Sequence, residues 1–490
     1  MNILLVEPRT PDTFWSLRHA LPFLGKRAAN PPLGLLTLAG LLPREWTCRL
    51  VDQNVRRLHD ADLEWADWVL VSAMVVHRDA VADLVMRCRR TGKPLIGGGP
   101  LFLSETDRSL GVEHVVVGEA EDVAADVVAD MRRGEVRALY QAPEFPDLAR
   151  TPPPRWDLVD LDDYATLSVQ SCRGCPFDCE FCDVTALNGR KPRYKSAAQF
   201  IAELETLRTR GWQGQVFVVD DNFIGNKRRA RELLHAMIAW RRRTGARMVF
   251  LTEASVDMAA DPALLDLMAE AGFKKVFLGL ETPSLESLRE CRKLQNLRGD
   301  LAEAVRTIQR AGLEVMGGFI VGFDSDEKDI FQRQFEFIQK TGVVTAMVGL
   351  LQALPRSRLY QRLAREGRLL ARSAGNNTEA VFNFEPRLDR AFLEDSYRKL
   401  MRQLYEPGVY YRRIRTFLET YDPRGPRTPV SRAEIAALLR SLWVMGVRHR
   451  GRLAYWRFMI GTLVRHPRKI GAAVTLTIMG HHFRRVAAGL

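Results

Sequence analysis

The chain contains few cysteines and no long hydrophobic run. Seven cysteines in 490 residues, an odd number, argue against the disulfide framework of a small secreted protein. The longest apolar stretch near the end, residues 470–480, is far shorter than the roughly 20 residues that a membrane-spanning helix needs. Residues 1–8 lack the basic and long apolar regions of a secretory signal. We therefore expect a cytoplasmic protein.

Acidic residues are scarce in only one part of the chain. Residues 401–490 hold seventeen Lys and Arg but four Asp and Glu, an excess of thirteen that equals the net charge of the whole chain. The first 400 residues are therefore neutral, which excludes a histone-like protein coated with positive charge. Hydrophobic residues make up 46% and charged residues 27%, as in soluble globular proteins. The length predicts two to four domains.

Short apolar runs alternate with helical patterns in residues 1–145. This alternation predicts an α/β fold, a doubly wound (Rossmann-like) domain whose parallel sheet binds ligands at the carboxyl ends of its strands. Taken alone, the glycines at these strand ends fit tight turns better than a ligand site. The candidate residues there are Ser72, Gly97, Gly98, Gly99, Gly118 and Glu119.

Three further segments follow. Residues 146–165 are rich in proline, which continues neither a helix nor a central strand, and we predict a linker. Residues 166–366 contain six strand-and-helix units, which predict a partial (β/α)6 barrel with its chemistry at the C-terminal strand ends. Residues 367–490 show helical patterns only, and we predict a basic helical C-terminal extension.

Three cysteines with the spacing C-x3-C-x2-C follow the first predicted barrel strand: Cys175, Cys179 and Cys182. Three thiolates on one loop can ligate three irons of a [4Fe–4S] cluster and leave the fourth iron open, whereas a cluster held by protein alone uses four cysteines. Zinc sites instead pair two such motifs or add histidines, and neither is found nearby. We expect Cys172, three residues upstream, to be a spare thiol.

This loop resembles that of the radical S-adenosylmethionine (SAM) enzymes, whose C-x3-C-x2-C motif it matches in full. Phe181 matches the aromatic residue that the family places beside the adenine. The resemblance implies that an electron from the [4Fe–4S] cluster cleaves SAM, and that the resulting deoxyadenosyl radical removes a hydrogen atom from the substrate. It also implies an electron donor of the flavodoxin or ferredoxin type.

Residues at four later strand ends match positions at which the family binds SAM. The second barrel strand ends in two aspartates, where the family contacts the methionyl amino group, and the third ends in a glutamate and a serine, where it binds the ribose. The fourth ends in a glutamate, and the fifth resembles the adenine-binding motif G-x-I-x-G. Singly, each pattern is more often a helix cap or a tight strand end, so their common order carries the prediction. In chain order these residues are Asp220, Asp221, Glu253, Ser255, Glu281, Gly318 and Gly322.

The N-terminal domain resembles the cobalamin-binding domain that precedes the barrel in one large subclass of this family. The six strand-end residues from Ser72 to Glu119 would then contact cobalamin. The motif D-x-H-x-x-G of other cobalamin domains is missing, so no histidine should replace the lower base of the cofactor. A vestigial domain without cofactor is the alternative.

Arginines and aromatic residues are interleaved in the C-terminal extension, for example in Tyr455-Trp-Arg457. Three interpretations stay open: helices that contact an anionic membrane surface or a lipid, a grip on single-stranded nucleic acid, or a helical cap with a solvated basic face. Residues 453–464 are apolar over much of the helix circumference, which favours the lipid and makes nucleic acid the weakest of the three. His481 and His482 lack a matching ligand set, so we predict no metal there.

The extension also resembles a subgroup of the family in which some members methylate hopanoid lipids. We expect a cobalamin-dependent radical SAM methyltransferase that acts on an unactivated carbon of a hydrophobic, isoprenoid or lipid-like substrate, with possible peripheral membrane contact through the tail. No single catalytic side chain stands out. The alternatives are a rearrangement or cyclisation without methyl transfer, modification of RNA or a peptide, and a non-enzymatic sensor.

Overall fold

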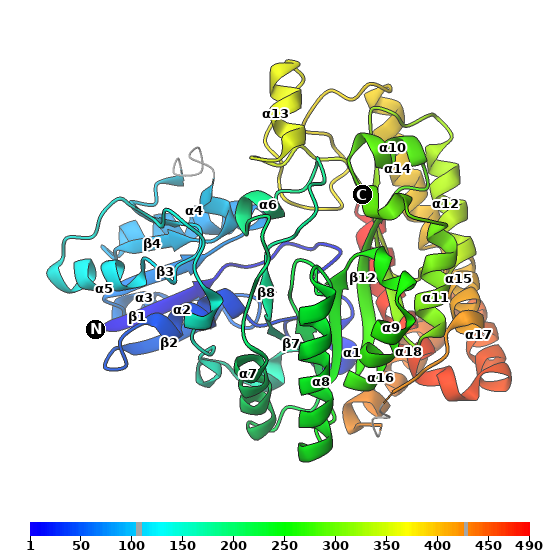
Figure 1. Ribbon diagram of the computed structural model, residues 1–490, viewed down its shortest axis with the longest axis horizontal. Helices are drawn as coiled ribbons and strands as arrows, with labels where there is room; N and C mark the ends of the chain where they lie inside the picture. Colours follow the sequence, from blue (N-terminus) through cyan, green and yellow to red (C-terminus); the bar gives the residue numbers. More distant parts are fainter. Residues whose placement is uncertain (104–109, 426–429) are drawn as a thin grey trace.

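The computed structural model describes residues 1–103, 110–425 and 430–490. Its N-terminal part is a six-stranded sheet of order β2-β1-β3-β4-β5-β6 in which all neighbours are parallel (Figure 1). The strands are β1 (Asn2–Glu7), β2 (Thr47–Asp52), β3 (Trp68–Ser72), β4 (Leu95–Gly98), β5 (His114–Val117) and β6 (Leu139–Gln141).

Helices cover both faces of this sheet because its strands are apolar on both sides. Ile3 and Leu5 of β1 pack with α2 (Leu33–Leu41) and α5 (Ala124–Arg133). Leu4 and Val6, which point to the opposite face, pack with α3 (Asp60–Trp65) and α4 (Arg78–Arg90). A run of consecutive apolar residues is typical of such a doubly covered parallel strand.

A second parallel sheet, of order β14-β13-β12-β11-β10-β7, forms the centre of the molecule. Its strands alternate with helices, as a (β/α)6 barrel requires, and the sheet does not close. The strands are β7 (Thr166–Val169), β10 (Gln215–Val218), β11 (Val249–Ala254), β12 (Phe273–Glu281), β13 (Glu314–Val321) and β14 (Ala346–Leu350). The helices that follow them include α7 (Ala197–Thr209), α8 (Lys227–Thr244), α9 (Pro262–Ala271), α11 (Leu301–Arg310) and α12 (Ile330–Thr341).

The C-terminal helices cover the open edge of the barrel beside β14 (Figure 1). The hydroxyl groups of Tyr397 and Tyr405 donate to the carbonyls of Val348 and Ala346, at 3.0 and 2.6 Å. The buried guanidinium of Arg413 donates to the carbonyl of Val344, just before that strand. The helices are α13 (Arg358–Arg365), α14 (Arg390–Leu404), α15 (Pro407–Thr420), α16 (Arg432–Trp443), α17 (Arg452–Arg465) and α18 (Ile470–Ala488), with a π-helical turn, η9 (Val444–Arg448), after α16.

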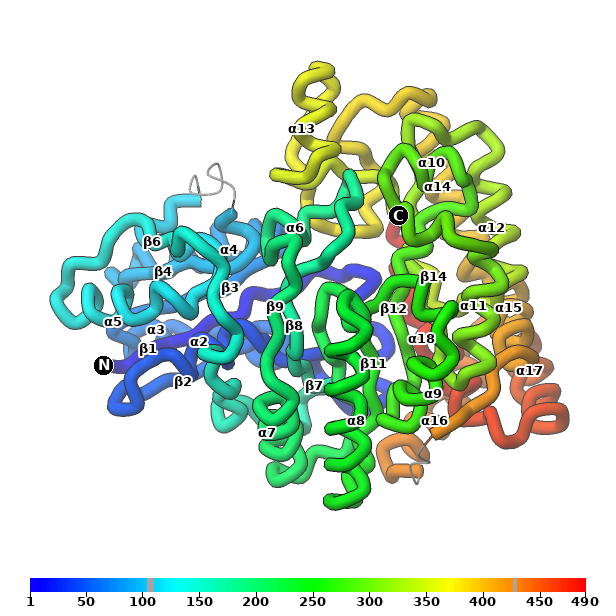
Figure 2. The backbone as a smooth tube through the Cα atoms, in the orientation of Figure 1, coloured from blue at the N-terminus to red at the C-terminus, as the bar shows by residue number. Residues whose placement is uncertain are grey.

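The segment between β1 and α2 leaves the N-terminal sheet and crosses to the barrel, as the blue part of the tube in Figure 2 shows. The Trp15 ring packs edge-on against Phe277 of β12, and its indole N–H points to the sulfur of Met347 in β14. The Phe14 ring stacks on Phe483 of α18 with ring centroids 4.1 Å apart. The segment between β1 and α2 therefore packs against both the barrel and helix α18.

The predicted fold class is confirmed: both large sheets are parallel, and the second has the six strands that the six strand-and-helix units predict. The edge strand β6 and helix α18 were not predicted. Residues 470–480, which stood out as an apolar stretch, lie in α18, where Ala473, Leu476 and Phe483 are buried against the other C-terminal helices. Over the part of the chain that the structure describes, no helix combines the length and hydropathy needed to cross a membrane.

Candidate functional site

The three cysteines lie on the loop between β8 (Cys172–Arg173) and α6 (Val184–Leu187), directly after β7. Gly174, at φ +99°, begins this loop. A Cβ atom there would lie 2.9 Å from the backbone oxygens of Asn188 and Gly189, so only glycine fits. Cys172 is fully buried in the β8–β9 hairpin (β9, Arg193–Tyr194), outside the loop itself.

All three cysteines are buried or half-buried on this one loop. Three thiolates on one loop can ligate three irons of a [4Fe–4S] cluster. Burial raises the pKa of all three thiols, that of Cys182 to about 12, so binding of iron releases protons.

Asp220 and Asp221, which follow β10, hold the cysteine loop. Asp220 is buried and accepts hydrogen bonds from the backbone N–H groups of Ser171 and Cys172, at 2.7 and 2.9 Å, and from the Ser171 hydroxyl. Asp221 accepts from the N–H of Gly174 at 2.6 Å and from the Asn188 amide. Burial raises the pKa of both carboxyls, that of Asp220 to about 6. These contacts place both side chains behind the cysteine loop.

Of the other predicted SAM residues, Phe181, Glu281 and Gly318 line the large cavity between the two sheets. Glu253 ends β11 half-buried, and burial raises its pKa to about 7. Ser255 is buried and accepts from the Asn222 amide at 3.2 Å. Gly318 of β13 faces Phe277, whose ring would lie 2.8 Å from an added Cβ. Gly322 has φ +101°, and its N–H donates to Asp326.

Two residues near the cysteines carried no signal in the sequence. Lys293 lies twelve residues beyond Glu281, and the two side chains form a buried ion pair of 2.7 Å. Burial acts to lower the pKa of Lys293, but Glu281 outweighs it and the pKa is raised. The ammonium also lies 5.8 Å from the centre of the Phe181 ring. Gln295 donates to the sulfur of Cys179 at 3.7 Å. A fixed positive charge thus lies beside the cysteine loop, where a carboxylate ligand would be favoured.

A cavity of about 1220 Å³ lies between the N-terminal sheet and the mouth of the barrel. It is larger than the roughly 300–1,000 Å³ of ordinary small-molecule sites. Its wall combines the carboxyl ends of strands from both sheets with the crossing segment, and much of it is apolar. Met74 and His77 line the cavity on the side of the N-terminal sheet, and Phe181 and Glu281 line it on the side of the barrel. Phe14 and Trp15 of the crossing segment form the third side.

The residues predicted to contact cobalamin lie at the strand ends beside this cavity but do not line it. Gly99 has φ +92°, and an added Cβ would meet the backbone of Ala73 at 2.8 Å and the Ser72 hydroxyl at 2.9 Å. Gly97 likewise leaves no space beside the Phe102 ring, and Gly98 ends β4. Gly118 has φ +86° with open space around it. The carboxylate of Glu119 points to two arginines of the barrel, Arg173 and Arg193.

His77 lines the cavity but offers no free nitrogen. Its Nδ1 accepts from the Met74 N–H at 3.4 Å, so its Nε2 carries the proton and donates to the Thr10 hydroxyl at 3.1 Å. Burial lowers the pKa of His77 to about 4, which keeps the ring neutral. The fit to cobalamin therefore rests on the size of the cavity and on the tight glycine turns, without a histidine ligand.

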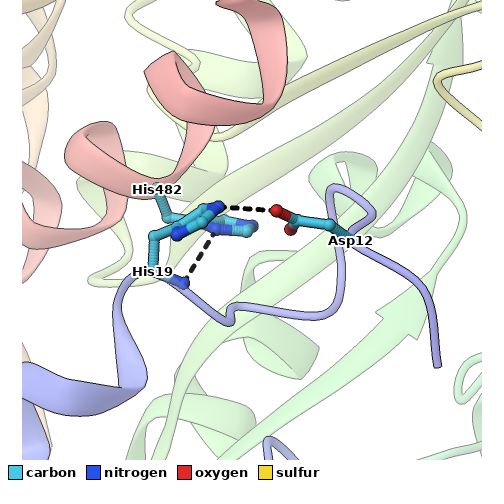
Figure 3. Close-up of side chains that lie close together, drawn as sticks. All are labelled: Asp12, His19 and His482. Carbon is cyan, nitrogen blue, oxygen red and sulfur yellow. Dashed lines mark hydrogen bonds and ion pairs between the residues drawn. The ribbon is translucent and has the colours of Figure 1, made fainter. Parts of the chain in front are cut away.

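His482 meets Asp12 and His19 from the opposite end of the chain (Figure 3). Their ligand atoms lie within 4.8 Å of one another, a grouping that the sequence did not predict. However, each of these atoms already has a partner. His19 Nε2 bonds Asp12 at 2.6 Å, and His482 donates from Nε2 to the Phe14 carbonyl at 3.0 Å and accepts on Nδ1 from the His19 N–H. These hydrogen bonds join the segment between β1 and α2 to helix α18, and we call the group of Asp12, His19 and His482 the latch.

Comparison with known proteins agrees with this geometry. Residues 169–338 match the family described as the radical SAM superfamily, and residues 357–490 match a domain of unknown function, DUF4070. Two solved structures share the fold across the chain at 15% identity. The radical SAM methyltransferase TsrM of Kitasatospora setae, solved with cobalamin and a [4Fe–4S] cluster, has a TM-score of 0.63 with all of both chains covered. The cobalamin-dependent radical enzyme OxsB, with 99% of this chain and 84% of that chain covered, has a TM-score of 0.64.

The fold and the cysteine loop thus define a radical SAM enzyme with a [4Fe–4S] cluster, whose N-terminal domain has the fold seen in cobalamin-dependent members. An uncharacterized methyltransferase of Synechocystis sp. is 41% identical over 490 residues, which is 99% of this chain and 91% of the relative. The hopanoid C-2 methylase of Rhodopseudomonas palustris is 34% identical over 98% of this chain and 92% of its own length. The chain belongs to the radical SAM superfamily, and these two relatives are named a methyltransferase and a methylase.

Proposed function

We propose that the chain is a cobalamin-dependent methyltransferase that transfers a methyl group to an unactivated carbon of a hydrophobic, polycyclic isoprenoid-like lipid. The observation that carries the proposal is the cavity of about 1220 Å³ that the two sheets share. Its volume leaves room for a large cofactor together with a substrate, and Phe14, Trp15 and Phe277 offer apolar surface to a hydrocarbon. The similarity to the hopanoid C-2 methylase supports the substrate class.

The protein's own part in the reaction is to hold three groups in one closed site. Cobalamin would supply a methyl carrier, while the cluster and SAM would supply the radical. We propose that cobalamin lies beside the strand-end turns of Ser72, Gly97, Gly98, Gly99, Gly118 and Glu119, which support the cavity wall from behind. On the barrel side, Lys293, which pairs with Glu281, would also attract the SAM carboxylate, and the half-buried Glu253 would accept from its amino group or ribose. Asp220 and Asp221 would position the cluster loop.

The test is an anaerobic assay of the protein reconstituted with iron, sulfide and cobalamin. With SAM labelled in its methyl group and a polycyclic lipid in detergent, we expect labelled lipid together with equal amounts of S-adenosylhomocysteine and deoxyadenosine. The variant Trp15→Ala should raise the KM for the lipid, whereas Trp456→Ala, outside the cavity, should not in detergent. Deoxyadenosine without S-adenosylhomocysteine would instead indicate a rearrangement or cyclisation.

We also propose that an acidic flavodoxin or ferredoxin reduces the cluster from the side of Asp178, between the first two cysteines. Arg190, Arg292 and Arg358 all lie within 4 Å of this one carboxylate and are about half exposed. Three guanidinium groups on one carboxylate leave a positive patch beside the cysteine loop, which would steer an acidic donor.

The double variant Arg292→Glu/Arg358→Glu should slow reduction by flavodoxin about tenfold at low salt and leave reduction by dithionite unchanged. Arg210→Glu/Arg247→Glu, with the same change of charge on exposed arginines elsewhere, is the matched control. Equal loss with both reductants would show damage to the cluster rather than to a docking surface.

A further inference from the structure

Helix α16 and the π-helical turn η9 expose an apolar stripe. Ile435, Leu439, Trp443 and Val447 recur every four residues, and each is between 49% and 60% exposed. The opposite side of α16, with Ala437 and Ser441, is buried against the protein. This exposure is unusual because a helix of a soluble protein normally turns its apolar side inward.

Helix α17 carries a second exposed stripe that meets the first at η9. Its members are 39% to 80% exposed: Leu453, Trp456, Ile460, Leu463 and Val464. The indole N–H of Trp456 donates to the carbonyl of Gly446 at 2.9 Å, next to Val447. Since this contact joins the two helices, the stripes run into each other at the turn. We call the nine residues of the two stripes the apolar ridge.

The surroundings of the ridge carry charge of one sign. Residues 435–490 contain ten Lys and Arg and no Asp or Glu. Arg448, Arg452, Arg457 and Arg465 lie on the same turn and helix as the ridge, and all four are exposed. An apolar ridge among arginines, with a tryptophan at either side of the turn, is the composition of helices that insert into the headgroup region of an anionic bilayer.

We propose that the apolar ridge docks on an anionic lipid surface. A second copy of the chain fits less well, because pairing two such faces would bring their exposed arginines together. Single-stranded nucleic acid also fits less well, because it stacks on aromatic rings, and seven of the nine ridge residues are aliphatic. Leu, Ile and Val side chains instead gain from burial among acyl chains.

The ridge is connected to the wall of the large cavity. Arg440 of α16 donates to the carbonyl of Phe23 in α1 (Leu21–Leu24) at 2.8 Å, and Leu21 lines the cavity. Helix α18 is bound to the same crossing segment through the Phe14–Phe483 stack and the latch of Figure 3. Docking would therefore place the crossing segment near the lipid. Delivery of a membrane-held substrate to the cavity rests on the proposed function. Docking of the ridge on lipid does not.

The test is flotation of the full-length protein with vesicles of phosphatidylcholine, with or without 30% phosphatidylglycerol. We expect binding to the anionic vesicles only, weakened by salt. Two double variants should each weaken vesicle binding at least about tenfold: Leu439→Ser/Leu453→Ser and Arg448→Glu/Arg457→Glu. Only the arginine variant should also reduce the dependence of binding on salt concentration. Met86→Ser/Leu285→Ser and Arg210→Glu/Arg247→Glu are matched controls on exposed residues elsewhere and should bind as the wild type does.

Three results would overturn the inference. One is flotation that the ridge variants leave intact. Another is a dimer in light scattering that Leu439→Ser/Leu453→Ser converts to a monomer, because a second copy would then cover the ridge. The third is binding of RNA, but not of vesicles, that the arginine variant abolishes. The detergent assay of methyl transfer distinguishes docking on lipid from the proposed function. The ridge variants should keep full activity in detergent. A wild-type protein that binds vesicles but is inactive in that assay would refute only the proposed function.

Discussion

Replacement of Glu119 by glutamine tests what joins the N-terminal domain to the cluster loop. The side chain of Glu119 is 9% exposed, and it pairs with Arg193 and with Arg173, which lies two residues before Cys175. Removal of one partner from a buried ion pair commonly costs about 3–5 kcal/mol. Both arginines keep other partners: Arg173 keeps Glu121 at 2.8 Å, and Arg193 keeps the carbonyls of Pro146 and Asn188. We therefore expect a cost of about 2–3 kcal/mol.

This cost predicts a small but measurable shift of the thermal midpoint. Unfolding entropy of about 2.1 cal/mol/K per residue amounts to about 1 kcal/mol/K for 490 residues, so the midpoint should fall by about 2–3 °C. The double variant Glu119→Gln/Arg193→Gln should show a coupling of at least about 1 kcal/mol in a denaturant cycle. Glu45→Gln is the control, because Glu45 pairs with Arg132 on the surface of the same domain and should leave the midpoint unchanged.

A coupling below about 0.5 kcal/mol would refute the ion-pair argument, since that is the usual scatter between independent sites. If Glu119→Gln also kept its iron but lost cobalamin in equilibrium dialysis, Glu119 would act chiefly on the cofactor. If the ion pair determines stability, iron retention during mild heating should fall together with stability, because Arg173 ends β8, the strand that leads into the cysteine loop.

Three further predictions concern the barrel. Cys182→Ala should lose most of its iron and all SAM cleavage, whereas Cys88→Ala, in the core of the N-terminal domain, should keep its iron, as colorimetric iron assay would show. Gly322→Ala should cost about 1–3 kcal/mol in denaturant unfolding, because φ is +101° and the new Cβ would lie 2.6 Å from the Phe382 ring. Asp220→Asn should change the pH dependence of stability. The folded state holds the Asp220 proton up to about pH 6, above its ordinary pKa of about 4, so relative to the variant the wild type should lose about 2 kcal/mol as the pH rises from 4 to 7.

Each of these has an outcome that contradicts it. Full iron content in Cys182→Ala would remove that residue from the cluster. Unfolding of Gly322→Ala within 0.5 kcal/mol of wild type would show that the strand end relaxes freely. A pH-independent difference between wild type and Asp220→Asn would mean that the Asp220 carboxyl is not held protonated by burial, and chemical denaturation at four pH values would detect it.

Most strands of both sheets were predictable because they are short, largely apolar runs bounded by turn residues. The same rule explains the omission of β6, since its three residues, Leu139–Gln141, make too short a pattern at a sheet edge. Helix α18 was overlooked for a different reason. Ten of its nineteen residues are buried, on several sides, so it lacks the one-sided pattern by which the other helices are recognised.

By itself the sequence determined the parts of this protein that depend on neighbours along the chain. The three cysteines share one loop whatever the fold does, and the absence of acidic residues after position 434 makes the end of the chain basic in any conformation. Only the tertiary structure decided which distant groups meet. Lys293 joins Glu281 across twelve residues, and Phe14 reaches Phe483 across almost the whole chain. The apolar residues of α16 and α17 show no difference in sequence from core residues, because exposure depends on what the rest of the chain covers, and these two helices were left with one side uncovered.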